Sequence, residues 1–333
     1  MPDNSLYHPV SIGSLTIEGN LFLAPLAGYT DRSFRSICLA KGANLAYTEM
    51  VSAEGLARDN AATQKLMQRA DNEKLLAVQI FGPDSEVIKR SLSLLLEHKP
   101  NLIDLNCGCP VPKVVKDGSG SALMKNPDKI YAIVKELKDS TSIPISVKIR
   151  LGWDHSSINY KEVTSALLEA NVDMITMHAR TRSMGYGGKA DWQSLAFLKE
   201  YIKNRAPKVP LFGSGDLFSP NDAKRMLEET KVDGIMFARG ALGNPFIFEQ
   251  THHLLTTGEL LELPSLANKL ETMLNHLHKM AFDLGEEQAA RQMRKHAVDY
   301  LKGVAYASKA KQAFVTAQTV KEYEEICATL SQS

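Results

Sequence analysis

Two cysteines separated by one glycine follow a short apolar run in the segment IDLNCGCPVPK, residues 103–113. The chain has only four cysteines, the C-x-C spacing differs from that of zinc sites, and no histidine follows nearby, so we predict no metal site. Cys109 stands on a Gly-Cys-Pro turn whose stiffness would fix the thiol over a cavity. Because a thiol so placed can give or take one proton, Cys109 is the first candidate catalytic residue.

Polar or small residues also close the other short apolar runs of the chain. They are Ala24, Pro25, Leu26, Glu49, Gln79, Asn106, Lys148, Arg150, His178, Arg180, Ser214, Gly215, Asp216, Ala238 and Arg239. A lone lysine in an apolar strand is rarely buried without a partner. We interpret Lys148 either as a Schiff-base lysine, as in barrel aldolases, or as a cation beside a cofactor ring that becomes negative on reduction.

The last two of these runs end in glycine-containing loops, FGSGD (212–216) and ARG (238–240). Small residues let backbone N–H groups approach an anion, and Arg239 can neutralise its charge. The GSGD sequence alone fits an ordinary turn equally well. Its place near the end of a barrel favours a phosphate site.

A basic segment at residues 288–311 carries six lysines and arginines and a single acidic residue, Asp299. The basic residues are Arg291, Arg294, Lys295, Lys302, Lys309 and Lys311. The spacing predicts that Arg291, Lys295, Lys302 and Lys309 share one side of a helix. A solvated helix face is the plain alternative. In combination with a catalytic barrel, the segment indicates an RNA-binding surface.

The elements that must position these residues alternate between β-rich runs and helical-period stretches. Eight near-continuously apolar runs occur, at 21–25, 44–50, 75–81, 102–106, 144–150, 172–178, 209–215 and 232–240. They predict an α/β fold, a (β/α)₈ TIM barrel, with a doubly wound open sheet as the alternative. The segment SIGSLTIEGN (11–20) predicts a small hairpin that closes the barrel floor.

The barrel pattern stops at a glycine- and proline-marked segment, residues 256–265, and no strand-like run follows it. We therefore predict a TIM-barrel catalytic domain at 1–255 and a small all-helical domain at 265–333.

The composition of the 333 residues, 44% hydrophobic and 23% charged, is typical of soluble globular proteins, and no stretch is apolar enough to span a membrane. The first residues lack the features of an export signal and cysteines are few, so we expect a cytoplasmic protein. A net charge of +1 excludes a protein coated in positive charge, although not a local basic patch. Nothing in the sequence indicates an obligate protein partner.

Several motifs together resemble those of the tRNA-dihydrouridine synthases, from about residue 8 to residue 305. The matching segments are APLAGYTDRSFR (24–35), YTEMVSA (47–53), DLNCGCPVPKVVKDGSGSALMKNP (104–127), VKIRLGW (147–153), MHARTRSMGYGGKADW (177–192), FGSGDL (212–217), DGIMFARGALGNPFIF (233–248) and RKHAVDYLKG (294–303). The subgroup resembled is the bacterial type B, named after the nitrogen-regulation reading frame.

The resemblance implies an FMN-binding barrel, NADPH or alternatively NADH as reductant, tRNA recruited by the helical domain, and reduction of a uridine C5–C6 double bond. Cys109 resembles the proton donor to C5, Asn106 the residue that holds the uracil edge, and Arg180 a substrate-side residue. The residues that resemble contacts of the cofactor ring are Ala24, Pro25, Leu26, Gln79, Lys148 and His178. Those that resemble contacts of its phosphate and ribityl chain, or stand in the same loops, are Ser214, Gly215, Asp216, Ala238 and Arg239.

Four positions depart from the family pattern: Leu26 replaces a common Met, Ser214 a frequent Asn, Ala238 a frequent Gly, and Asp299 a frequent Trp. Two other functions compete with the resemblance. One is an FMN barrel like dihydroorotate dehydrogenase, which acts on a free pyrimidine and has no use for a basic helical domain. The other is a non-catalytic RNA-binding barrel, which would bind no flavin.

Overall fold

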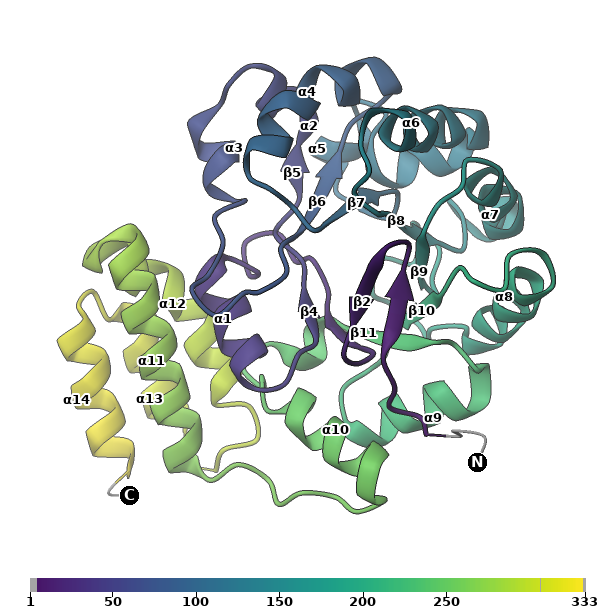
Figure 1. The fold of residues 1–333 in the computed structure, drawn as a ribbon. Coiled ribbons are helices and arrows are strands. Elements are labelled where there is room, and N and C mark those ends of the chain that lie inside the picture. The colour runs from purple at the N-terminus through teal and green to yellow at the C-terminus, as the bar shows by residue number, and fades with distance from the viewer. Residues whose placement is uncertain (1–4, 306, 332–333) are drawn as a thin grey trace.

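A computed structural model describes residues 5–305 and 307–331 of the chain. Its first element is an antiparallel hairpin of β1 (Val10–Ile12) and β2 (Leu15–Ile17). Apolar residues of the hairpin pack with Phe22 and Phe212, which lie inside the barrel. The hairpin therefore covers one end of the barrel, as predicted (Figure 1).

Nine short parallel strands form one sheet, in the order β4-β3-β11-β10-β9-β8-β7-β6-β5. Their bounds are β3 Leu21–Leu23, β4 Leu45–Ala46, β5 Val51–Ser52, β6 Ala77–Phe81, β7 Leu102–Asn106, β8 Ile145–Arg150, β9 Met174–His178, β10 Leu211–Ser214 and β11 Gly234–Phe237. Tyr47, just after β4, forms a parallel bridge with Ala77 of β6, so the two ends of the sheet meet. β4 and β5 are thus two pieces of one barrel strand, of which the predicted run at 44–50 contains β4 and stops one residue before β5. The sheet is a closed barrel of eight strands, not an open sheet.

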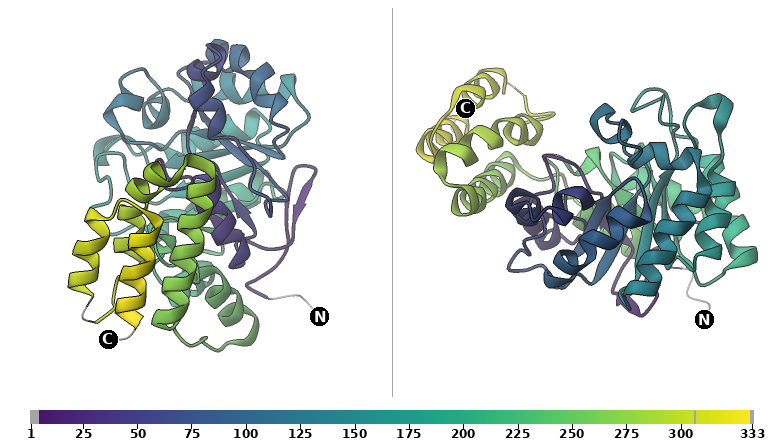
Figure 2. Two further views of the ribbon diagram at one scale, coloured as in Figure 1. Left: turned by 90° about the vertical axis from the view of Figure 1, so that its left-hand side faces the viewer. Right: turned by 90° about the horizontal axis from the view of Figure 1, so that it is seen from above.

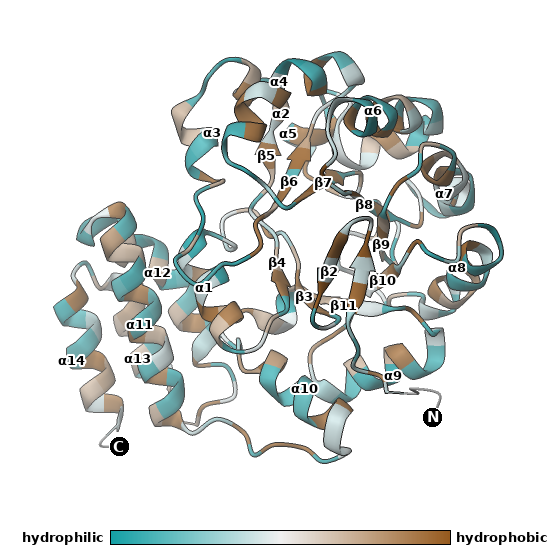
Figure 3. Ribbon diagram, viewed as in Figure 1, coloured by the Kyte–Doolittle hydropathy of each residue, from teal (hydrophilic) through white to brown (hydrophobic). Residues whose placement is uncertain are grey.

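Helices surround the barrel, and the longer ones bury apolar residues in the same core as the strands (Figures 1 and 3). They are α1 Arg32–Ala40, α2 Ala53–Ala57, α3 Ala61–Lys65, α4 Ser85–Glu97, α5 Pro112–Val115, α6 Pro127–Ser140, α7 Tyr160–Glu169, α8 Trp192–Arg205, α9 Pro220–Thr230 and α10 Ile247–Thr257. Three 3₁₀ turns, η1 (Gly120–Lys125), η2 (His155–Ser157) and η3 (Arg239–Ala241), lie in loops at the C-terminal ends of the strands. The segment between β7 and α6 contains α5 and η1.

The last four helices form a separate lobe beside the barrel (Figure 2). They are α11 (Leu266–Leu284), α12 (Glu286–Tyr300), α13 (Ser308–Thr316) and α14 (Val320–Ser331), and they share a buried core of their own. An ion pair of 2.7 Å between Arg32 of α1 and Asp283 of α11 joins the lobe to the barrel. The predicted end of the barrel domain at residue 255 lies inside α10, which continues to Thr257.

The predicted helical side through Arg291, Lys295, Lys302 and Lys309 is wrong. α12 ends at Tyr300, and α13 begins only at Ser308. Gly303 between them adopts a φ of +74°, a left-handed conformation that ends helices and that glycine adopts without strain. Lys302 and Lys309 therefore leave the helix that carries Arg291 and Lys295. Within the described segments, no helix combines the length and apolarity needed to cross a membrane.

Candidate active site

A cavity of about 420 Å³ opens at the C-terminal ends of the barrel strands, a volume typical of small-molecule sites. Most of the residues predicted for catalysis and cofactor binding line it. They are Ala24, Pro25, Leu26, Gln79, Asn106, Cys109, Lys148, His178, Ser214, Gly215, Asp216, Ala238 and Arg239. They lie at the C-terminal ends of seven strands, β3 and β6 to β11, or in the loops that follow these strands.

The register of the sheet explains why these side chains meet. Asn106 of β7 lies opposite Lys148 of β8, and Ser214 of β10 lies opposite His178 of β9. Side chains two residues apart on a strand point to the same face. Asp104 therefore shares the inner face of β7 with Asn106, opposite Ser146 and next to Gln79 of β6.

A fully buried carboxylate, Asp104, holds this part of the site together. Its two oxygens accept hydrogen bonds from Gln79 Nε2 and Ser146 Oγ, both at 2.6 Å. Gln79 Oε1 in turn accepts a bond of 2.7 Å from Asn106 Nδ2. Burial raises the pKa of Asp104 to about 6, although the two hydrogen bonds and the nearby Lys148 oppose the rise. Asp104 thus fixes the amide orientation of Gln79 and, through it, that of Asn106.

Lys148 and His178 give the middle of the cavity its charge. Burial, together with the positive charge of the neighbouring Arg150, lowers the pKa of Lys148 to about 8. Among the described residues the ammonium of Lys148 has charged neighbours but no hydrogen-bond partner. Burial and the cations around His178 hold the pKa of its imidazole well below the usual range. The site therefore offers a neutral imidazole and an ammonium whose hydrogen-bonding capacity is unused.

The loop that carries Cys109 is held from three sides. Asn106 Oδ1 accepts hydrogen bonds from the N–H groups of Gly108 at 3.1 Å and Cys109 at 2.9 Å. Arg150 Nε donates to the Gly108 carbonyl at 2.7 Å, and Ser121 Oγ donates to the Cys109 carbonyl at 2.9 Å. Burial raises the pKa of the Cys109 thiol, so it stays protonated at neutral pH. The loop presents a protonated thiol of fixed position to the cavity.

Arg180 was expected on the substrate side, and the structure corrects this expectation. Its side chain is buried, and its Nη2 donates to both carboxylate oxygens of Asp216, at 2.7 and 2.8 Å. The guanidinium also donates to the carbonyls of Gly187 and Gly188. Asp216 further accepts from the N–H group of Ala190 at 2.8 Å. Arg180 and Asp216 therefore brace the loop after β9 against the loop after β10, because a buried cation needs such partners.

The opposite side of the cavity has the close backbone contacts expected of a phosphate site. Gly215 has a φ of +116°, and a Cβ there would lie 2.9 Å from the His178 ring. A Cβ on Gly240 would lie only 2.1 Å from the Leu217 carbonyl. The guanidinium of Arg239 lies 4.3 Å from the centre of the Tyr186 ring. The two glycine positions therefore have no room for a side chain, and the contact with Tyr186 keeps the Arg239 guanidinium at the rim of the cavity.

Four of the predicted RNA-binding residues divide into two groups. Arg294 donates to the Ala317 carbonyl at 3.0 Å and so connects two segments of the lobe. Lys295 donates to the Gly28 carbonyl and so connects the lobe to the barrel. Arg291 is exposed, and the Lys302 side chain is 67% exposed although it pairs with Asp299. Only the second group faces solvent as an RNA contact requires.

A second cavity of about 530 Å³ connects the barrel mouth with the helical lobe. It shares Tyr29, Phe218 and Arg239 with the first cavity, and Lys269 and Lys302 line its other side. A ligand larger than one ring can therefore extend from the catalytic cavity onto the lobe.

Comparison with known proteins assigns the family. Residues 22–333 match the sequence model described as Dihydrouridine synthase (Dus). A probable tRNA-dihydrouridine synthase from Treponema pallidum is 44% identical over 309 residues, 91% of this chain and 90% of the relative. tRNA-dihydrouridine synthase B from Pasteurella multocida is 33% identical, over 93% of this chain and 92% of the relative. The chain belongs to the dihydrouridine synthase family.

Solved structures confirm the fold of this family member. A 2-naphthoyl-CoA reductase complex superposes with a TM-score of 0.59 at 10% identity, covering 76% of this chain and 52% of that one. Histamine dehydrogenase from a Rhizobium species superposes with a TM-score of 0.57 at 15% identity, covering 83% and 51%. At these identities the likeness concerns the barrel architecture alone.

Sequence reasoning missed several site residues of this family member. Asp104 was passed over, although its position two residues before Asn106 on one strand is a usable signal. Arg150 was noted at a strand end but not assigned to the Cys109 loop. Tyr29 stands in the matching segment 24–35 but had no role assigned to it, and Lys269 gave no local signal, because it reaches the second cavity from a distant segment of the chain.

The Asn106 contacts predict that Asn106→Ala loosens the Cys109 loop. The change removes the acceptor of two N–H groups, and each donor left unpaired in a buried place costs about 1–3 kcal/mol. We expect faster alkylation of Cys109 by iodoacetamide, measured by peptide mass spectrometry. Asn101→Ala is the control, because Asn101 accepts bonds at the other end of β7. Equal alkylation rates of Cys109 in both variants would refute the bracing role of Asn106.

Proposed function

We propose that this chain reduces uridines of tRNA to 5,6-dihydrouridine, with FMN as bound cofactor and NADPH as reductant. The observation that carries the proposal is one cavity that combines the protonated thiol of Cys109, the unpaired ammonium of Lys148 and the glycine loops beside Arg239. Relatives that bear the name tRNA-dihydrouridine synthase cover about nine-tenths of the chain and support this reading.

The residues present fit a flavin mononucleotide. Lys148 and Gln79 offer a cation and an amide for the polar edge of the ring, while the backbone at Ala24–Leu26 forms an apolar wall. Ser214, Gly215 and Arg239 would hold the phosphate, because small residues and a cation suit an anion. When bound and reduced, the cofactor supplies the hydride that adds to C6 of the uracil ring. A cation fixed in advance, such as Lys148, would stabilise negative charge on the ring.

Cys109 would supply the proton for C5 of the uracil. Its thiol is protonated at neutral pH because burial raises its pKa, and the backbone bonds to Asn106 and Ser121 fix its position. Asn106 lines the same cavity and would lie against the edge of the uracil. A base turned out of the tRNA stack can reach this cavity at a cost of a few kcal/mol, which contacts to the RNA backbone must offset.

A barrel that reduces a free pyrimidine is the competing function. The second cavity, which leads from Arg239 to Lys302 on the helical lobe, favours a polymeric substrate over a free base. Purified protein loaded with FMN should consume NADPH and form dihydrouridine with unmodified tRNA. Reduction of free orotate with no reaction on tRNA would overturn the proposal, and failure to bind FMN would favour a non-catalytic RNA-binding barrel.

The proton-donor role predicts that Cys109→Ala retains FMN binding and flavin reduction by NADPH but loses most tRNA reduction. General acid catalysis contributes about 10²–10⁴-fold in rate, so we expect a loss in that range. Single-turnover reoxidation of the flavin by tRNA measures it. The matched control is Cys107→Ala, because Cys107 is fully buried in the apolar core and does not line the cavity. Unimpaired reoxidation in Cys109→Ala would exclude the role.

The exposed cations predict that replacing Arg291 and Lys302 together by Ala weakens tRNA binding and its salt dependence. Each lost phosphate contact reduces the slope of log K against log salt by about 0.7–0.9. Filter binding across a salt series measures the slope. The control replaces Lys203 and Lys208, exposed residues near the end of α8, at the opposite end of the barrel. A slope that is the same in the two double variants would contradict an RNA contact at Arg291 and Lys302.

A further inference from the structure

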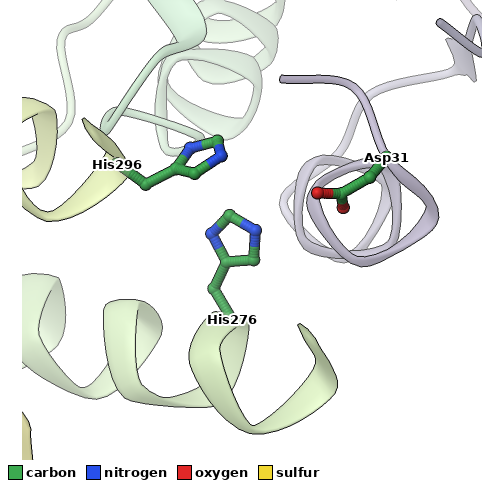
Figure 4. Close-up of side chains that lie close together, drawn as sticks. All are labelled: Asp31, His276 and His296. Carbon is green, nitrogen blue, oxygen red and sulfur yellow. The ribbon is translucent and has the colours of Figure 1, made fainter. Parts of the chain in front are cut away.

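Three potential metal ligands meet at the junction between the barrel and the helical lobe, away from the catalytic cavity. Asp31 precedes α1 of the barrel, His276 lies on α11 and His296 on α12 (Figure 4). Each offers one ligand atom, and these atoms lie within 4.8 Å of one another. Figure 4 shows the three side chains converging from three separate segments.

The histidines are buried without the hydrogen bonds that buried imidazoles normally make. Both rings have no exposed surface, and in the described part of the chain neither nitrogen of His296 has a hydrogen-bond partner. His276 Nε2 is also unpaired, whereas His276 Nδ1 lies 3.5 Å from Tyr300 Oη. A buried polar atom without a hydrogen-bond partner lowers the stability of the fold. A bound ligand would satisfy nitrogens among these three.

We propose that Asp31, His276 and His296 bind a divalent transition-metal ion of the zinc class. Two imidazoles and one carboxylate are a common protein ligand set for such ions, with a fourth position left to water. Zinc holds its nitrogen and oxygen ligands at about 2.0–2.2 Å, so small side-chain rotations must bring the three atoms closer together. Tyr300 at His276 Nδ1 acts as the outer partner that orients the ring and leaves Nε2 for the metal.

The groups around the site are compatible with a cation. Two cations act on Asp31, Arg35 and Lys295. Arg35 pairs with Glu73 at 2.7 Å, and Lys295 directs its ammonium to the Gly28 carbonyl and over the Tyr29 ring. Asp31 Oδ1 accepts a hydrogen bond from the N–H group of Phe34, because Asp31 is the N-cap of α1. Edge and tilted contacts of the rings with Phe34 and Tyr29 pack the site, but such contacts satisfy no ring nitrogen. Packing alone therefore does not account for the site.

A metal at this position would fasten the helical lobe to the barrel. Asp31 comes five residues after Leu26, which lines the catalytic cavity, so the same short loop connects the two sites. Because metal binding and the docking of the ligand-bearing segments are linked, the ion would stabilise the relative position of barrel and lobe. The second cavity, which lies between them, depends on that position.

The test uses the full-length protein, stripped with a chelator and titrated with Zn²⁺ alone. We expect one zinc per chain by mass spectrometry of the metal content and a rise in the melting temperature. Asp31→Asn keeps an oxygen for the N-cap bond, because Asn caps helices as well as Asp, and should lower zinc affinity at least tenfold. His296→Gln should abolish stoichiometric binding. His278→Ala, an exposed histidine on α11 paired with Glu324, is the control and should change nothing.

Three outcomes would overturn the metal site. They are wild-type protein that binds no zinc, binding that is equal in Asp31→Asn and wild type, and binding that is lost in His278→Ala but kept in His296→Gln. If His296→Gln does not fold, two other experiments still test the site. One is the zinc affinity of Asp31→Asn, and the other is the absorption spectrum of the wild-type protein with Co²⁺, which should show nitrogen and oxygen ligands and no sulfur ligand. These readouts are independent of tRNA reduction, so they stand or fall separately from the proposed activity.

Discussion

The buried carboxylate of Asp104 is the constraint on which the site depends. A carboxylate that is buried from solvent is tolerated only when its oxygens accept hydrogen bonds, and here Gln79 and Ser146 donate them. Because Gln79 Nε2 donates to Asp104, Gln79 Oε1 is turned toward Asn106 and accepts a hydrogen bond from Asn106 Nδ2. Asn106 Oδ1 in turn accepts a hydrogen bond from the backbone N–H group of Cys109. One internal charge on β7 thus determines the amide orientations that position the thiol. Lys148 beside it supplies the opposite charge to the cavity.

The barrel and the helical lobe contribute different parts of one surface. The barrel provides the cavity with its thiol and ammonium, while the lobe provides exposed cations and one side of the second cavity. The sequence predicts Lys295 and Arg294 as RNA contacts, but in the structure their side chains donate hydrogen bonds to the backbone carbonyls of Gly28 and Ala317. Basic residues in this segment therefore serve two purposes, and only burial and partners distinguish them. The junction histidines, His276 and His296, are placed where these parts meet.

The fold was largely predictable, because a chain in which apolar runs alternate with stretches of helical periodicity is compatible with few architectures. The polar residues at the strand ends followed from that architecture, since the C-terminal ends of barrel strands meet at one mouth. The second strand was not seen as interrupted, because a bridge at Tyr47 depends on pairing with distant Ala77. Arg180 was misjudged because its partner Asp216 comes from another loop. The junction of Asp31 with His276 and His296 was invisible for the same reason, as no spacing rule connects residues so far apart.

The central claim is that a cofactor ring and the Cys109 thiol face one another across a single cavity. The most direct measurement is a crystal structure of the protein with FMN bound. It should place the ring against Ala24–Leu26 and Lys148, the phosphate between Ser214 and Arg239, and the sulfur of Cys109 on the side of the ring left open for a base. A flavin bound elsewhere, or a sulfur remote from the open face of the ring, would contradict the account.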